Sequence, residues 1–336
     1  MKRPRRASST GLAALACLTA VACAPSYSKG ARSSSPALRT AAFPELWSET
    51  GTERLSRREP DSPGAGAGPI VMESDGSPFR GKRRVLIVGV AKYADGNYDE
   101  LPNAARDAEA LAEYFRSPEG GGLTSDRVIL LQDEQATRAE VLGRLREMLL
   151  RAQDDEMVIF YFAGHGQAPS SDRTSERYLV TYDSRMNNPF TAIERDEIDN
   201  LLDDTDAESQ VVMLDCCFSG GEGLRGAVME EDPFSRFSES PTGKLQRRAV
   251  LTSTSGSETA RDWLDGSDNS PFAHFLLRAL RGEDRTLVDK DADGTLSIRE
   301  LHAYVRSNVR TAVTAAHRQS PQLYGDPDLP VAELER

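Results

Sequence analysis

From residue 82 onward, short apolar runs alternate with amphipathic stretches, and this alternation constrains the fold more than any other feature. The run at 85–90 is continuous and rich in β-branched residues, which is typical of a strand covered on both faces. Further strands are predicted at 128–131, 157–162, 177–183, 210–215 and 249–252. Helices are predicted at 103–116, 137–151, 194–202, 271–281 and 297–314. We therefore expect an α/β fold with a mostly parallel central sheet and helices on both faces.

Composition and charge narrow the class of protein further. The 336 residues are 38% hydrophobic and 28% charged, which suits one large soluble domain with tails. The first 40 residues carry seven basic and no acidic side chains, so the remainder has a formal net charge of −19. Because nucleic-acid phosphates would be repelled by this charge, we expect no nucleic-acid partner.

The N-terminus has the features of a bacterial secretory signal. Residues 1–6 are basic, and the apolar run at 11–22 is too short to span a bilayer. The run ends Ala-Val-Ala-Cys23, which resembles a lipobox in which Cys23 is lipidated and becomes the first mature residue. The alternative is cleavage before Pro25, which would remove Cys23 and release a plain secreted protein. We expect export across the inner membrane and a lipid anchor, with the protein periplasmic or at the cell surface.

Residues 24–81 are rich in Ser, Pro, Gly, Ala and Arg and lack a sustained apolar period. Such a composition cannot bury enough apolar surface to offset its conformational entropy. The sequence therefore predicts a signal peptide at 1–23, a flexible tether at 24–81 and a folded domain at 82–330.

Two of the predicted strands end in reactive side chains. His165 lies between two glycines just after the strand at 157–162, and Cys217 follows the strand at 210–215. An imidazole near a thiol can promote formation of the nucleophilic thiolate and later protonate a leaving amine. Taken singly, the histidine could mark an ordinary turn and the cysteine could serve packing. Their separation of 52 residues matches the caspase spacing, which favours a catalytic pair.

The segments around these residues resemble those of caspase-like cysteine peptidases of the metacaspase and bacterial orthocaspase group. Tyr-Phe-Ala-Gly-His165-Gly166 is similar to the family's histidine motif, and Asp215-Cys-Cys217-Phe-Ser-Gly is similar to its Asp-x-Cys-x-Ser-Gly motif. The resemblance covers about residues 83–328 and implies a caspase-like fold. It also implies an oxyanion site made by the backbone N–H groups of Gly166 and Cys217.

Aligning the Asp-x-Cys motif makes Cys217 the nucleophile, and strand alternation supports this assignment. Asp215 and Cys217 share one face, whereas Cys216 points to the other face and is expected to pack in the interior. A strained disulfide between the adjacent cysteines is the alternative, and it would block catalysis.

Asp215 lies two residues before the nucleophile on its face, so it can line the pocket for the residue before the scissile bond. The resemblance implies that Asp107 supplies a second carboxylate and that Ser253 borders the pocket. The alternatives are a helix-capping role for Asp215 and a solvated helix position for Asp107. Carboxylates in this pocket predict cleavage after Arg or Lys, with Arg bound by two parallel hydrogen bonds.

A second motif, Asp-Lys-Asp-Ala-Asp-Gly-Thr-Leu-Ser-Ile-Arg-Glu at 289–300, fits the EF-hand calcium loop. Gly294 occupies the sharp turn. The predicted Ca²⁺ ligands are Asp289, Asp291, Asp293, Thr295 and Glu300. Because the loop has no second copy in the sequence, the alternative is a turn that only caps a helix.

The sequence therefore predicts a cysteine endopeptidase that acts on peptides or proteins after Arg or Lys, is calcium-responsive and needs no organic cofactor. The segment at 221–248 contains several basic residues, and the resemblance implies autocleavage there. A catalytically inactive calcium-binding scaffold at the cell surface is the main alternative, and an acyl hydrolase with the same pair of residues is a further one.

Overall fold

The structure is a computed structural model that describes residues 82–167, 177–217, 247–255, 258–313 and 318–334. All of these residues belong to the unit Pro69–Arg336. The strands are β1 (Arg83–Gly89), β2 (Val128–Gln132), β3 (Met157–Ala163), β4 (Gly166–Gln167), β5 (Tyr178–Leu179), β6 (Ile193–Glu194), β7 (Ser209–Asp215), β8 (Arg247–Thr252), β9 (Thr295–Ser297), β10 (Gln322–Gly325) and β11 (Pro330–Glu333). The α-helices are α1 (Pro102–Arg116), α2 (Arg138–Arg151), α3 (Arg195–Asp203), α4 (Pro271–Leu280), α5 (Arg285–Val288) and α6 (Ile298–Ala312).

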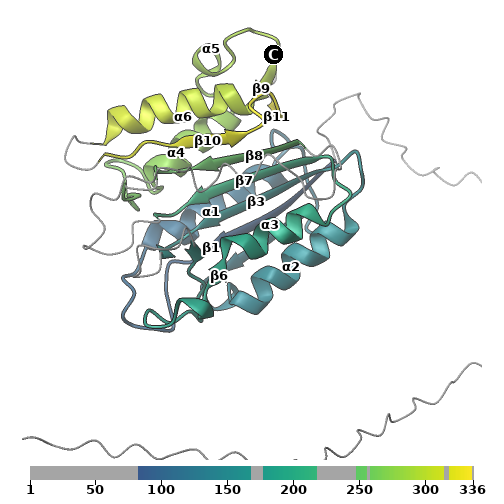
Figure 1. The fold of residues 1–336 in the computed structure, drawn as a ribbon. Coiled ribbons are helices and arrows are strands. Elements are labelled where there is room, and N and C mark those ends of the chain that lie inside the picture. The colour runs from purple at the N-terminus through teal and green to yellow at the C-terminus, as the bar shows by residue number, and fades with distance from the viewer. Residues whose placement is uncertain (1–81, 168–176, 218–246, 256–257, 314–317, 335–336) are drawn as a thin grey trace, which may run out of the picture. The chain divides into compact units, whose positions relative to one another are not determined.

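A six-stranded sheet in the order β10-β8-β7-β3-β1-β2 forms the centre of the domain (Figure 1). All neighbouring pairs are parallel except β10 and β8, which are antiparallel. Every residue of β3 is buried, as expected for a strand covered on both faces. The expected α/β fold with a mostly parallel sheet is confirmed.

Helices cover both faces of this sheet and divide the core into two layers. Along β1, Val85 and Ile87 belong to the layer with α1, α4 and α6, whereas Leu86 and Val88 belong to the layer with α2 and α3. This division follows from the two-residue period of a strand, which turns successive side chains to opposite faces.

Close packing between β1 and α1 depends on Gly89. A Cβ atom at Gly89 would lie 2.6 Å from the carbonyl oxygen of Ala104 and 2.6 Å from Cβ of Ala108. Only glycine therefore allows α1 to approach the end of β1 so closely. This approach brings Asp107, which lies in the same helix, toward the sheet.

The structure departs from the predicted elements mainly in the connections. The predicted strand at 177–183 is reduced to the two residues of β5, which join β4 and β6 in a small separate sheet. Two-residue strands carry too little periodic pattern to be recognised in a sequence. The structure also contains α5 and a two-stranded sheet of β9 and β11, which the sequence pattern does not indicate.

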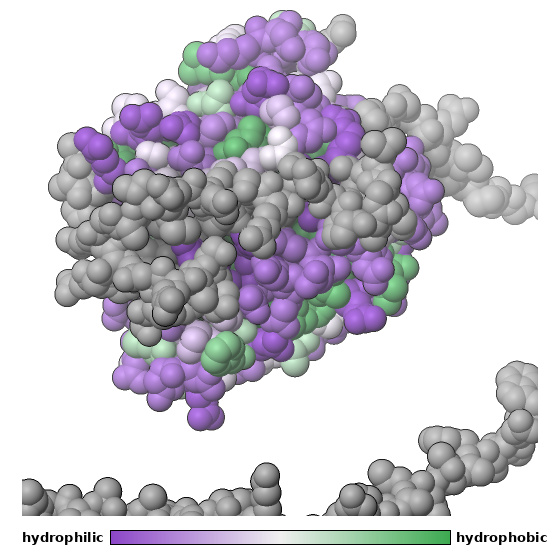
Figure 2. Space-filling view, in the orientation of Figure 1, coloured by the Kyte–Doolittle hydropathy of each residue, from purple (hydrophilic) through white to green (hydrophobic). Residues whose placement is uncertain are grey.

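The described surface is mainly hydrophilic on the side that Figure 2 shows, with small, separate hydrophobic patches. In the part of the chain that the structure describes, no helix combines the length and apolar character needed to span a bilayer.

Candidate active site

His165 and Cys217 follow neighbouring parallel strands at the same edge of the central sheet. In the pairing of β3 with β7, Ala163 lies opposite Asp215, so each reactive residue comes two positions after an aligned strand end. Chemistry in such sheets is found beyond the carboxyl ends of the strands. Both residues line one cavity of about 170 Å³.

The imidazole of His165 is held by the segment between β1 and α1. Its Nε2 lies 2.9 Å from the carbonyl oxygen of Asp99. A carbonyl oxygen can only accept, so this contact assigns the proton to Nε2 and leaves Nδ1 as the basic nitrogen. Burial lowers the pKa of His165, and the contact with Asp99 opposes this effect. The ring is therefore kept neutral near physiological pH, as a general base must be.

Two tyrosines fix the backbone and the ring of His165. The hydroxyl of Tyr93 accepts the backbone N–H of His165 at 2.8 Å and donates to the carbonyl of Val90 at 3.1 Å. The ring centroids of Tyr93 and Tyr98 lie 5.2 and 5.8 Å from that of His165. These contacts restrict the imidazole to one orientation.

The strand pairing orients the N–H of Gly166. Val180 donates its N–H to the carbonyl of His165 at 3.0 Å, and Gly166 is the residue opposite Leu179. Hydrogen-bonded and non-hydrogen-bonded pairs alternate in an antiparallel ladder, so Gly166 belongs to a non-hydrogen-bonded pair. Its N–H therefore points away from β5, as a donor to an external oxyanion must.

The two adjacent cysteines occupy different environments. Cys216 is 1% exposed and packs in the core layer of α2 and α3, where burial raises the pKa of its thiol. Cys217 is half-buried and lines the cavity. Both are free thiols, so the structure contains no disulfide between them. Strand alternation thus places the residue that the sequence predicts as nucleophile at the cavity.

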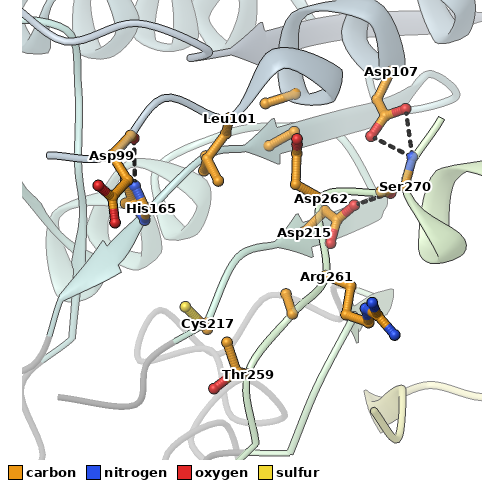
Figure 3. Close-up of a pocket in the computed structure, with 14 residues that line it drawn as sticks. Asp99, Leu101, Asp107, His165, Asp215, Cys217, Thr259, Arg261, Asp262 and Ser270 are labelled. Carbon is orange, nitrogen blue, oxygen red and sulfur yellow. Dashed lines mark hydrogen bonds between the residues drawn. The ribbon is translucent and has the colours of Figure 1, made fainter. Parts of the chain in front are cut away.

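Besides Asp99, three aspartates from separate segments line the cavity, and we call Asp107, Asp215 and Asp262 the pocket carboxylates. Asp107 accepts the N–H of Ser270 and the side-chain amide of Asn269. Asp215 accepts the hydroxyl of Ser270 at 2.7 Å. In the view of Figure 3, these contacts lie on one side of the cavity, and His165 and Cys217 lie on the other.

Burial makes the ionised form of the pocket carboxylates costly. It raises the pKa of Asp215 to about 6, and the neighbouring Asp262 adds to this effect. Burial and the charge of Asp215 raise the pKa of Asp107 well above its usual range. The pKa of Asp262 is raised mainly by burial as well. A cation placed among them would favour the ionised forms.

One cationic residue, Arg261, borders the cavity, but its guanidinium is engaged elsewhere. Its Cζ lies 3.9 Å from the centroid of the Trp263 ring, a cation–π contact. Among the described residues, no ion pair joins Arg261 to a pocket carboxylate. Arg261 therefore does not neutralise the pocket carboxylates.

A family model for the caspase domain, peptidase family C14, matches residues 82–329. The chain belongs to this family. Crystal structures show the same fold. A protein from Geobacter sulfurreducens aligns with a TM-score of 0.51 and 18% identity, over 76% of this chain and all of that one. Caspase-1 from Spodoptera frugiperda aligns with a TM-score of 0.50 and 13% identity, over 76% and 93%. The predicted caspase-like fold is thus confirmed.

Curated relatives include a probable protease of a Desulfuromonadales bacterium, which is 22% identical over 262 residues. That match covers 72% of this chain and 31% of the relative. Metacaspase-1 of Emericella nidulans is 29% identical over 98 residues, which are 27% of this chain and 24% of the relative. This caspase-domain chain therefore spans less than a third of the length of either relative.

Ser253 differs from its predicted place in this caspase domain. It is fully buried at the end of β8 and is not among the residues that line the cavity. Its hydroxyl still lowers the pKa of Asp215, so it lies close to that carboxylate. Ser253 thus lies in the interior beside Asp215 and not at the cavity wall.

The alternatives for the two predicted pocket aspartates are resolved by their contacts. Asp107 is 1% exposed, so it is not a solvated helix residue. Asp215 does not cap a helix itself, but its partner Ser270 does, since the Ser270 hydroxyl accepts the N–H of Ala273. Both carboxylates therefore line the cavity and also hold the start of α4.

Several residues of the site were not predicted from the sequence. Asp262 and Asp99 lie in irregular segments whose position depends on the whole fold, and the tyrosines have no distinctive spacing. Ser270 had a usable signal, because serine followed by proline is typical of a helix start.

The remaining predicted site residues lie elsewhere. A carboxylate oxygen from each of Asp289, Asp291 and Asp293 falls within a cluster whose atoms are all within 4.8 Å of one another. Glu300 instead joins Ser297 in a capping box at the start of α6, and Thr295 begins β9. Cys23 and most of the segment at 221–248 lie outside the described residues.

Proposed function

We propose that this caspase domain is a cysteine endopeptidase that cleaves peptide bonds after Arg or Lys. The observation that carries the proposal is the set of pocket carboxylates, two of them buried and Asp262 partly buried, in the cavity that His165 and Cys217 border. Holding two buried carboxylates and a partly buried one together is unfavourable unless a cation joins them. A guanidinium can meet such carboxylates through paired hydrogen bonds, whereas an aspartate side chain would be repelled.

In the proposed reaction, the thiol proton of Cys217 moves to Nδ1 of His165, and the thiolate attacks the carbonyl carbon of the scissile bond. The N–H groups of Gly166 and Cys217 would stabilise the oxyanion that forms. His165 then protonates the leaving amine, which yields a thioester. Water, deprotonated by His165, hydrolyses the thioester and regenerates the thiol. The carbonyl of Asp99 supports the imidazole in each of these steps by accepting from Nε2.

Fluorogenic peptides that end in Arg, Lys or Asp test this proposal on the wild-type chain, Cys217→Ala and Cys216→Ala. We expect cleavage after Arg and Lys, none after Asp, no detectable turnover by Cys217→Ala, and near wild-type rates for Cys216→Ala. Cleavage only after Asp would contradict the pocket assignment. Full activity of Cys217→Ala would contradict the nucleophile, and no turnover of any peptide would favour the inactive scaffold.

We also propose that the protein is exported and anchored through a lipid on Cys23, on the strength of the signal-like sequence at 1–22. Fractionation of cells that express the wild type or Cys23→Ala tests this idea. We expect the wild type in the membrane fraction and the variant largely in the soluble fraction. Equal membrane association of the two would exclude the lipid anchor.

Self-cleavage between 221 and 248 is a further part of the proposal, because that segment offers five basic residues to an Arg- or Lys-directed peptidase. Mass spectrometry of wild-type and Cys217→Ala preparations tests it. We expect fragments that begin after a basic residue in the wild type alone. An intact chain in a fully active preparation would exclude it.

A further inference from the structure

The loop between α5 and α6 combines an acidic cluster with a buried, unpaired oxygen. We call Asp289, Asp291 and Asp293 the loop carboxylates, and a carboxylate oxygen of each lies within 4.8 Å of the others. Asp289 is only 6% exposed, and its Oδ1 has no hydrogen-bond partner. A buried carboxylate oxygen without a partner is costly, so it needs a donor or a cation.

Backbone contacts hold these carboxylates in place. Oδ2 of Asp289 accepts the N–H of Gly294 at 3.2 Å, and Oδ1 of Asp293 accepts the N–H of Thr295 at 2.6 Å. Gly294 has a φ of +86°, which only glycine adopts readily. The loop therefore turns sharply and directs its acidic side chains toward one another.

The C-terminal strand β11 supplies the pairing that a lone loop would lack. Residues 295 and 296 pair with Glu333 and Ala332, and Leu334 donates its N–H to the carbonyl of Gly294 at 2.9 Å. Because hydrogen-bonded and non-hydrogen-bonded pairs alternate, the N–H and carbonyl of Thr295 point away from β11. The N–H of Thr295 meets Asp293, so its carbonyl faces the same side as the loop carboxylates.

This strand is fixed to the rest of the domain. The guanidinium of Arg83, at the start of β1, donates to the carbonyl of Val331 at 3.1 Å and to that of Gly120 at 2.7 Å. Val331 and Ala332 are each 1% exposed. The position of the Thr295 carbonyl is therefore set by the core and not by the loop alone.

We propose that the loop at 289–300 binds one Ca²⁺, and that ion binding and the docking of β11 reinforce each other. The ligands are the loop carboxylates, the carbonyl of Thr295 and, after a side-chain rotation, Glu300. Ca²⁺ takes six to eight oxygen ligands in flexible geometry, whereas Mg²⁺ requires a tighter octahedron and keeps its waters. Several carboxylates with one carbonyl match Ca²⁺ better.

Two existing contacts compete with the ion. The carboxylate of Glu300 accepts the N–H groups of Lys290 and Ser297 and must give up one of them. The guanidinium of Arg285 lies 3.4 Å from Oδ2 of Asp289 and would repel a cation. Removing that charge should therefore strengthen binding, so Arg285→Gln is expected to bind Ca²⁺ several-fold more tightly.

Calorimetric titration of the full chain with CaCl₂ tests the site, and the Cys217→Ala background excludes self-cleavage. We expect one site, with affinity reduced at least tenfold in Asp293→Asn. The matched control Asp126→Asn removes an exposed carboxylate elsewhere and should bind as the parent does. At 100-fold excess over Kd, Ca²⁺ should raise Tm by about 5 °C in the parent. No heat and no Tm shift at 10 mM Ca²⁺, or parental binding by Asp293→Asn, would overturn the site.

Hydrogen exchange tests the role of β11 without altering it. We expect Ca²⁺ to slow amide exchange in the peptide that contains Leu334 at least tenfold in the parent, and not in Asp293→Asn, because coupling between two sites is reciprocal. Tight Ca²⁺ binding with unchanged exchange at Leu334 would overturn the coupling and leave only the metal site. Neither measurement depends on peptidase activity.

Discussion

The pocket carboxylates and the loop carboxylates are two acidic clusters of three aspartates each, built in opposite ways. The pocket carboxylates come from α1, the end of β7 and the segment before α4, and the sheet brings them together around a cavity. The loop carboxylates come from one stretch of five residues, 289–293, and two of the three carboxylates, Asp291 and Asp293, are exposed. A walled cavity suits an organic cation with a defined shape, whereas an open loop suits an ion that keeps some of its water.

The largest expected effect is on peptidase activity, which should depend on the pocket carboxylates and not on the loop carboxylates. Asp215→Asn should lower kcat/KM for Arg peptides by about 10³-fold or more, because it leaves a buried guanidinium without its charged partner. Asp291→Asn, assayed at the same calcium concentration, should change it less than twofold. Alkylation of Cys217 by iodoacetamide reports whether the thiol remains competent in Asp215→Asn. Equal losses in the two variants would mean that the clusters are not functionally distinct.

The second prediction ranks the other pocket carboxylates. Asp107→Asn should lower kcat/KM for Arg peptides about 10- to 100-fold, and Asp262→Asn about tenfold, because Asp262 is less buried. Asp268→Asn is the matched control, since its side chain is 97% exposed. If Asp262→Asn lowered kcat/KM for Arg peptides more than Asp215→Asn does, the main carboxylate for substrate recognition would be Asp262, in the segment before α4.

Cleavage of Arg peptides should depend on pH through the protonation of Asp215. Asp215 has a pKa of about 6, so below that pH it is protonated and loses its attraction for a guanidinium. We expect kcat/KM for Arg peptides to fall about tenfold per pH unit below 6. Burial lowers the pKa of His165, so its imidazole takes up a proton at a lower pH than a solvent-exposed histidine does.

The rate of Cys217 alkylation across the same pH range is the control, because iodoacetamide carries no cationic group. It should lack the inflection near pH 6, and Asp215→Asn should lack it for peptide cleavage too. An inflection that persists in Asp215→Asn would assign it to another group.

The two clusters also differ in how far the sequence could predict them, because only the loop carboxylates are close together in the chain. The loop carboxylates stand at fixed spacing in one motif, and the alternation of apolar runs was enough to predict the parallel sheet and to place His165 and Cys217 after it. Asp215 was predictable because strand alternation ties it to Cys217. Asp262 was not, because it reaches the cavity from an irregular segment held through Asn103, a contact across the fold.

Ser253 and β11 are two further features that the local sequence could not predict, because tertiary packing sets their positions. The position of Ser253 in the sequence suggested a pocket wall, but whether its side chain reaches the cavity or the interior depends on the packing of the whole fold. The strand β11 has four residues, and its partners in β9 lie 33 to 38 positions earlier in the chain, so no local pattern could predict that it supports the loop. Register between distant short strands is set by tertiary packing.

The smallest expected effect concerns stability, and its sign depends on pH. The pKa of Asp215 is raised on folding, so its favourable contribution to stability is present below its ordinary pKa and is lost as pH rises through about 6. At pH 7.5 the ionised side chain is destabilising. Asp215→Asn removes that charge but leaves an amide N–H group that the pocket must satisfy. The net gain is about 1 kcal/mol at pH 7.5.

Thermal unfolding at pH 7.5 and pH 5.0 measures this effect. We expect Tm of Asp215→Asn to exceed that of the wild type by a few degrees at pH 7.5 and to be equal or lower at pH 5.0, where the wild-type side chain is largely protonated. In Asp291→Asn, whose side chain is exposed, we expect no reversal between the two pH values. A higher Tm of Asp215→Asn at both pH values would show that its effect is one of packing. In that case the ionised Asp215 side chain would not destabilise the folded protein. A bound cationic substrate would then have no such destabilisation to relieve.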